Sequence, residues 1–134
     1  MFFKENEIMI TKLFDSELKV MEVVWEKGSL PAKKIAEILN ESIGWNKNTS
    51  YTVIKKCVEK SAIRREEPNF ICHALVTKAQ VGGAELDELV DKLFDGSAEL
   101  LFASLVERKK LPEDMINKLK ATVLSDKDSN GGMK

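Results

Sequence analysis

The chain has 134 residues, of which 43% are hydrophobic and 32% are charged, and its formal net charge is −1 at pH 7. This length and composition suffice for a buried core and exclude the fibrous and disordered classes. No apolar run approaches the roughly 18 residues of a membrane-spanning helix, and charges follow the N-terminal Met-Phe-Phe, so we expect a cytoplasmic protein without membrane insertion.

Two short helices are predicted after an N-terminal arm (1–12), whose apolar residues show no clear period. The first helix begins at Asp15, which we expect to be its N-cap, and it ends at Gly28. Pro31 suits the first turn of the second helix, which ends near Asn40. The apolar stripes of these helices are Leu18, Met21, Val24 and Trp25, then Ala32, Ile35, Ala36 and Leu39.

A third helix, from about residue 48 to residue 60, combines an apolar face with positive charge. Its apolar face holds Val53, Ile54, Cys57 and Val58, and residues 46 to 65 include six Lys or Arg and one acid. A solvated surface helix with ordinary lysines is one interpretation. The order of the elements favours DNA binding, because two short helices before a basic third helix form the helix-turn-helix arrangement, in which the last helix enters the major groove.

A β-hairpin is predicted next, with strands at 62–65 and 70–76 and a turn at Pro68-Asn69. A helix-turn-helix followed by a hairpin is a winged helix. Arg64 and Arg65 at the root of this wing are placed to reach backbone phosphates. His73, the one histidine of the sequence, is interpreted as a wing surface residue rather than a ligand.

The remaining sequence is predicted to be helical to about residue 124, with a helix stop at Gly96, an N-cap at Ser97 and a last helix starting at Pro112. Three amphipathic helices in about 45 residues have little room to bury their apolar stripes within one chain. We therefore expect a homodimer, with folding back onto a monomeric core as the alternative. The residues expected at the dimer interface are Leu89, Leu93, Leu101, Leu105, Ile116 and Leu119.

The predicted fold is mainly α with a small β-hairpin. It comprises a winged helix-turn-helix domain (1–78), an all-helical dimerisation region (79–124) and a flexible tail (125–134). Cys57, Cys72 and His73 lack the spacing of metal ligands, so we expect no metal and no cofactor. Without a Gly-rich phosphate loop or a catalytic constellation, the sequence argues against an enzyme.

Several of these segments together resemble the penicillinase repressor family, of the BlaI/MecI/CopY type. The matching features span roughly residues 12–124 and are Leu18-Xaa-Val20-Met21-Xaa-Xaa-Val24-Trp25, Ala32-Xaa-Xaa-Ile35, Trp45 with Thr49, Thr52 and Val53-Ile54, Leu93-Phe94-Asp95-Gly96-Ser97, and Leu111 with the acidic helix start after it. The resemblance implies a dimeric winged-helix repressor on palindromic operators. It implies groove-facing positions at Asn48, Thr49, Tyr51, Thr52 and Lys55, with Lys56 and Arg64 near phosphates.

The chain also departs from the pattern of this family. Ser61 stands where the family usually has Gly, between the basic helix and the wing. The resemblance implies that members controlling β-lactam resistance are cut at an Asn-Phe bond by a sensor-activated protease. The corresponding pair here is Ser104-Leu105, so it stays open whether a regulatory protease is a partner of this chain. The paired C-terminal cysteines of copper-responsive members are absent from this sequence.

The leading hypothesis is thus a homodimeric, sequence-specific repressor that binds a double-stranded DNA operator. The alternative from another class is a winged-helix adaptor whose basic helix docks an acidic protein. Steep salt dependence and a preference for particular duplexes would distinguish the first from the second.

Overall fold

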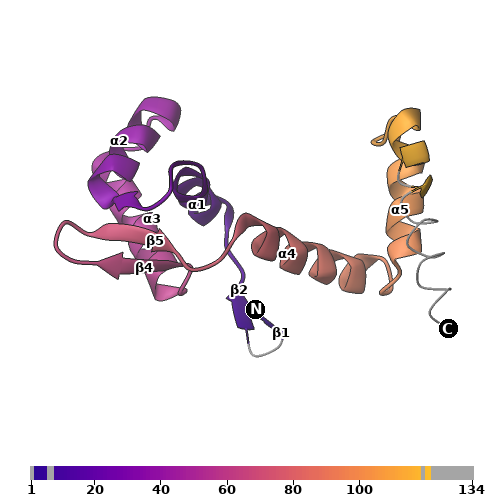
Figure 1. Cartoon of the computed structure of the whole chain (residues 1–134), viewed down its shortest axis with the longest axis horizontal. Helices are drawn as coiled ribbons and strands as arrows, with labels where there is room; N and C mark the ends of the chain where they lie inside the picture. The colour runs from indigo at the N-terminus through magenta and orange to yellow at the C-terminus, as the bar shows by residue number, and fades with distance from the viewer. Residues whose placement is uncertain (1, 6–7, 119, 122–134) are drawn as a thin grey trace. The chain divides into compact units, whose positions relative to one another are not determined.

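The computed structural model describes residues 2–5, 8–118 and 120–121, with side chains from residue 11 onward. The chain divides into two compact units, with the division between Leu86 and Asp87. The described elements of the first unit are a short N-terminal hairpin, three helices, a three-stranded sheet and the beginning of a fourth helix (Figure 1).

Helices α1 (Asp15–Lys27), α2 (Ala32–Ile43) and α3 (Lys47–Glu59) pack against one another and confirm the predicted helix-turn-helix. Gly44 ends α2 in the left-handed region, at φ 75° and ψ 16°, and its N–H bonds the Asn40 carbonyl. The largest fully buried side chains of the core include Met21, Ile35, Ile54 and Ile63. The predicted apolar stripes therefore face one another across this core.

The start of α1 corrects one prediction. Asp15 is the first residue of the helix and not its N-cap, a position that Phe14 occupies. Phe14 has no side chain that accepts a hydrogen bond, so Glu17 closes the turn instead, its Oε1 accepting the Phe14 N–H at 2.7 Å. Glu17 is thereby drawn into the core, where it is 2% exposed.

The wing consists of β4 (Ile63–Glu66) and β5 (Ile71–Ala74), which pair antiparallel with Arg64 opposite His73 and Arg65 opposite Cys72. A third strand, β3 (Leu30–Pro31), joins the other edge of β5 and gives the sheet the order β3-β5-β4. The sequence analysis predicted the hairpin but not β3, because two residues are too few to show the period of a strand.

The N-terminal arm, for which no element was predicted, forms a hairpin. Strands β1 (Phe2–Glu5) and β2 (Ile8–Thr11) pair antiparallel, with Phe2 opposite Thr11 and Glu5 opposite Ile8. Two strands of four residues are too short for alternation to stand out from a random pattern, so no strand could be predicted there.

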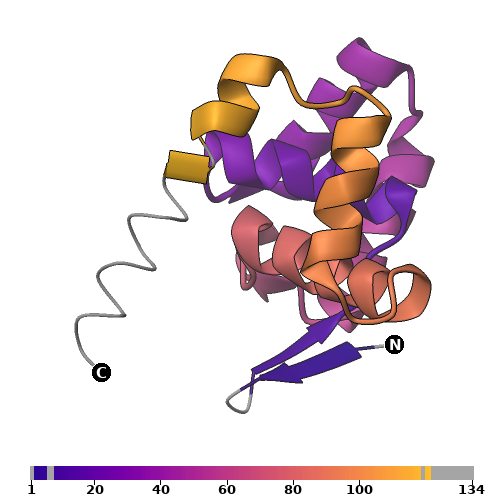
Figure 2. The ribbon, with the colours of Figure 1, turned by 90° about the vertical axis from the view of Figure 1, so that its right-hand side faces the viewer.

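After the wing, the chain continues as helices, as predicted. Helix α4 spans Lys78–Leu93, α5 spans Ala98–Glu107, and residues 113–118 form a further helical stretch (Figure 2). Gly96 follows α4 with a positive φ, and the Ser97 hydroxyl caps α5 by accepting the Leu100 N–H at 3.1 Å. The expected flexible tail (125–134) lies outside the described residues.

Candidate nucleic-acid interface

Helix α3 presents two faces of different chemistry. Its inner face is fixed in the core by Ser50, Val53, Ile54 and Cys57, all of which are buried. Its outer face carries five exposed residues of the expected DNA-binding set, namely Asn48, Thr49, Thr52, Lys55 and Lys56. The Asn46 side chain caps the helix by accepting the Thr49 N–H at 2.8 Å. A rigid helix thus holds an exposed row of amide, hydroxyl and ammonium groups.

Tyr51, also expected to face the groove, is half-buried at the edge of this surface. Its ring meets Phe70 of the wing edge to face, with 6.1 Å between the ring centroids, and the Lys47 ammonium lies 5.9 Å from its centroid. Tyr51 therefore contacts the wing as well as bordering the outer face of α3. Sequence reasoning did not identify Phe70, since an aromatic residue in a predicted strand has no distinctive pattern.

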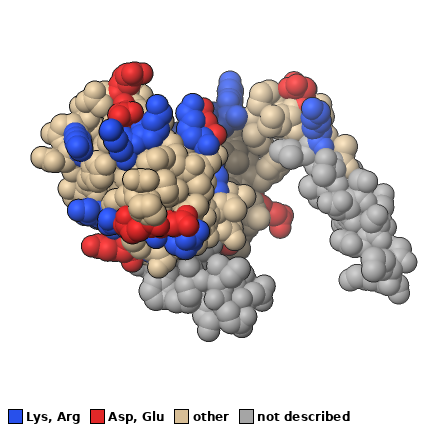
Figure 3. Space-filling view, turned by 60° about the vertical axis from the view of Figure 1, so that its left-hand side comes forward, with Lys and Arg blue, Asp and Glu red and all other residues tan. Residues whose placement is uncertain are grey.

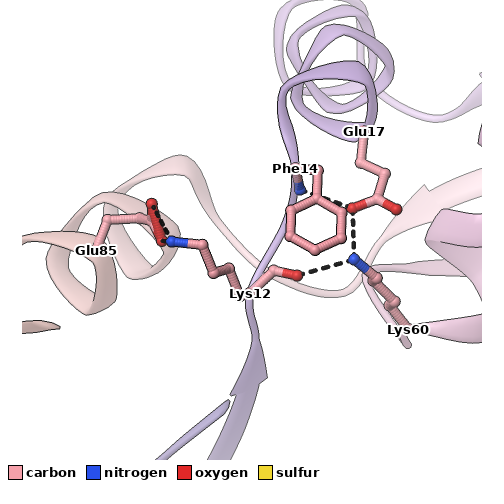
Figure 4. A network of polar contacts seen from close by, with 5 residues as sticks. All are labelled: Lys12, Phe14, Glu17, Lys60 and Glu85. Atoms are coloured by element: carbon pink, nitrogen blue, oxygen red, sulfur yellow. Dashed lines mark hydrogen bonds and ion pairs between the residues drawn. The ribbon is translucent and has the colours of Figure 1, made fainter. Parts of the chain in front are cut away.

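Lys60 was counted among the cations of the basic stretch, but the structure turns it inward (Figure 4). Its Nζ lies 2.6 Å from Glu17 Oε1 and donates to the Lys12 carbonyl at 3.0 Å. The same ammonium lies 4.0 Å from the centre of the Phe14 ring. Lys60 consequently neutralises a buried carboxylate, and its charge is not presented to a ligand. Lys12 in turn pairs with Glu85 of α4 at 3.1 Å.

The two arginines of the wing have different surroundings. The Arg65 guanidinium lies 3.7 Å from the centroid of the Phe70 ring, and its Nε donates to Glu67 Oε2. Arg64, the wing residue of the expected DNA-binding set, is exposed. The pKa of Glu66 is lowered chiefly by its hydrogen bond and charge interaction with His73, and the charge of Arg64 makes a smaller contribution in the same direction.

His73 joins the wing to the loop before β3. Its Nε2 lies 2.6 Å from Glu66 Oε1, and its Nδ1 lies 2.7 Å from Ser29 Oγ. Both ring nitrogens thus have protein partners, and in the part of the chain that the structure describes no group of three or more His, Cys, Asp or Glu residues is arranged to hold a metal ion.

The cysteine thiols are buried, and burial raises the pKa of Cys57 to about 12 and that of Cys72 to about 11. Glu17 adds to the shift of the Cys57 pKa, and Arg65 opposes the shift of the Cys72 pKa. Both thiols therefore serve as small core groups.

Charge on the first unit, which ends at Leu86, is not of one sign. In the view of Figure 3, lysine and arginine side chains are spread over this unit, and carboxylates lie among them. Within the described residues, Lys55 and Lys56 form no ion pair, whereas Arg65, Lys60 and Lys78 each have a carboxylate partner. The charges of Lys55 and Lys56 are therefore not offset by a bound carboxylate.

The expected dimerisation residues lie on helices that bury little. Leu89 and Leu93 are exposed, Leu101, Leu105 and Ile116 are half-buried, and Leu119 lies outside the described residues. Every buried hydrophobic residue of the described chain falls between Leu13 and Val81. No helix of the described residues has the length and apolar character to cross a membrane.

A helix-turn-helix, a three-stranded sheet with a wing, and a polar, basic outer face on the third helix together define a winged-helix DNA-binding protein. Comparison with models of known protein families identifies the family to which the chain belongs. The model of the penicillinase repressor matches residues 13–125, and the chain belongs to this family. Members of this family are transcriptional repressors that bind DNA, and they are not enzymes.

The chain is also similar to individual proteins of known name. The methicillin resistance regulatory proteins MecI of Mammaliicoccus sciuri and of Staphylococcus aureus (strain N315) are each 25% identical to the chain over 111 residues, which are 81% of this chain and 90% of each relative. Among solved structures, the DNA-binding domain of the repressor BlaI matches 57% of this chain and 92% of its own, with 22% identity and a TM-score of 0.49. The Bacillus licheniformis BlaI monomer in complex with the blaP half-operator has 23% identity and a TM-score of 0.46.

Proposed function

We propose that this repressor binds a palindromic operator as a homodimer, with α3 of each subunit in the major groove of one half-site. The observation that carries the proposal is the division of α3, whose inner face is buried in the core while its outer face is polar and basic. A two-fold dimer reads a two-fold sequence, with half-sites about one turn of DNA, or a multiple of it, apart.

Within this arrangement, the short side chains of Asn48, Thr49 and Thr52 are suited to base edges, and Lys55 adds a long donor for a guanine or a nearby phosphate. Lys56 is placed at the border of the helix and neutralises a phosphate. Tyr51 contributes the exposed part of its ring while it packs on Phe70. Repression follows when the bound dimer occupies the promoter region.

The apolar residues exposed on the helices after the wing support the proposed dimer. Exposed large hydrophobic residues recur on α4, on α5 and in the helical stretch 113–118, and Leu93 has the largest exposed fraction among them at 71%. The full set is Leu86, Leu89, Leu93, Leu100, Phe102, Val106 and Met115. Apolar surface of this extent is unfavourable in water, and a second copy of the same helices would remove it from solvent.

DNA binding is tested by selecting genomic fragments with the purified protein and measuring affinity for the selected duplex and a random duplex at several salt concentrations. We expect the Lys55→Ala variant to lose preference for the selected duplex as well as affinity. Lys92→Ala, which removes an exposed lysine of α4, is the matched control and is expected to leave both unchanged. Equal binding of both duplexes by the unmodified protein, at all salt concentrations, would refute sequence-specific recognition.

Dimer formation is tested by sedimentation equilibrium. Leu93→Asp places a charge on the exposed apolar surface and is expected to shift the protein toward the monomer and to weaken operator binding. Lys92→Asp introduces the same side chain at the neighbouring exposed position and is expected to remain dimeric. A monomeric unmodified protein at micromolar concentration would count against this part of the proposal.

A further inference from the structure

The register of the wing places its two adjacent arginines on opposite faces of the sheet. Residues paired across an antiparallel ladder share a face, and neighbours along a strand alternate. Arg65 is opposite Cys72, which is fully buried, so Arg65 lies on the face that packs against the core. Arg64 is opposite His73 and therefore lies on the other face.

The contacts of the two side chains agree with this placement. Arg65 stacks on Phe70, whose ring meets Tyr51 of α3, so the guanidinium belongs to the junction between the wing and α3. The charge of Arg65 opposes the rise in the pKa of the Cys72 thiol, which lies on the inner face. The charge of Arg64 instead contributes to the lowered pKa of Glu66, which lies on the outer face.

The Arg65 side chain is also held in one orientation. Its planar group lies over the Phe70 ring, and its Nε donates to Glu67. An arginine has five N–H donors, so the four on the two Nη atoms are left for another acceptor. The side chain remains 43% exposed, which gives a phosphate access to those donors.

Arg64 has neither of these restraints. In the described structure it has no ring contact and no ion pair, and Glu66, which follows it by two residues in β4, pairs with His73 instead. No contact in the described structure therefore holds its guanidinium in an orientation alongside α3.

We propose that Arg65, rather than Arg64, supplies the wing's contact with the DNA backbone, and that Phe70 and Glu67 are positioning residues that aim its Nη donors alongside α3. This inference rests on the proposed function, because it assumes that the outer face of α3 is the surface that meets DNA. It assigns the wing a phosphate contact that does not depend on base sequence.

The experiment compares Arg65→Gln with Arg64→Gln, two variants that remove the same charge from adjacent positions. Each is titrated with a labelled random-sequence duplex of about 40 base pairs at several salt concentrations, which gives the slope of log affinity against log salt. One lost phosphate contact lowers this slope by about 0.9 per subunit. We expect that loss for Arg65→Gln and an almost unchanged slope for Arg64→Gln.

Two further variants test the role of the ring and of the charge. Arg65→Lys keeps the charge and is expected to keep most of the slope. Phe70→Leu keeps an apolar side chain but removes the stacking surface, and we expect weaker binding of the duplex together with a slope between those of the unmodified protein and Arg65→Gln. Thermal unfolding of each variant shows whether the folded state is retained at the temperature of the titration.

The outcomes separate this inference from the proposed function. Equal slope losses for the two glutamine variants, a larger loss for Arg64→Gln, or no loss for Arg65→Gln would each overturn the inference while DNA binding by α3 stands. Binding of the duplex by Phe70→Leu with unchanged affinity and slope would overturn the positioning role of Phe70. Failure of the unmodified protein to bind any duplex would instead overturn the proposed function.

Discussion

Replacing Lys60 with methionine removes the ammonium group that contacts the buried carboxylate of Glu17. The two charged atoms are 2.6 Å apart, Glu17 is 2% exposed, and the Lys60 side chain is 23% exposed. Removing one partner of a buried ion pair leaves an uncompensated charge and costs about 3–5 kcal/mol. Because Lys60 retains some contact with solvent, we expect the lower end of this range, about 3 kcal/mol.

A loss of that size is large beside a total stability of about 5–15 kcal/mol. For a unit of this length, about 3 kcal/mol lowers the melting temperature by roughly 12–24 °C. The assay is urea unfolding followed by circular dichroism, with the melting temperature measured by calorimetry. Lys56→Met is the matched control, since Lys56 lies on the same helix, is exposed and forms no ion pair in the described structure, and its loss should stay within about 0.5 kcal/mol.

The double variant Glu17→Gln with Lys60→Met separates the buried charge from the lost packing. Glutamine keeps an oxygen that accepts the Phe14 N–H, and it carries no charge, so we expect the double variant to be more stable than Lys60→Met alone by at least about 1 kcal/mol. The reasoning is refuted if Lys60→Met costs no more than Lys56→Met, or if the double variant is the less stable of the two.

Three smaller changes test other details of the first unit. Ser50→Ala removes a buried hydroxyl that has no hydrogen-bond partner among the described residues, and we expect urea unfolding to show a gain of about 1 kcal/mol; a loss would mean that the hydroxyl is satisfied. Ser61→Gly relieves a left-handed backbone (φ 62°) and should raise the melting temperature, whereas Ser61→Ala should not. The raised pKa values of Cys57 and Cys72 mean that folding opposes thiol ionisation, so stability is full below about pH 9 and falls as the pH rises toward 11 and 12; in unfolding measured from pH 7 to pH 10.5, a variant with both cysteines replaced by alanine should fall less steeply.

The sequence alone determined the winged-helix order and the inner faces of its helices. Apolar spacing of three and four residues marks a helix wherever it lies in the fold, and Gly28, Gly96 and Ser97 mark helix ends through local backbone chemistry. The exposed polar row on α3 follows from the same spacing, because residues that are not on the buried face of a helix must lie on the other one.

The tertiary structure alone decided which cations are available. Lys60 and Lys56 are chemically identical in the sequence, and only the position of Glu17, 43 residues before Lys60, turns one inward and leaves the other exposed. Arg64 and Arg65 are adjacent in the sequence and have the same side chain. Only the pairing of Arg65 with Cys72 shows which of them lies on the inner face of the wing. Such assignments depend on contacts between residues distant in the chain, and a local pattern of residue types carries no record of those contacts.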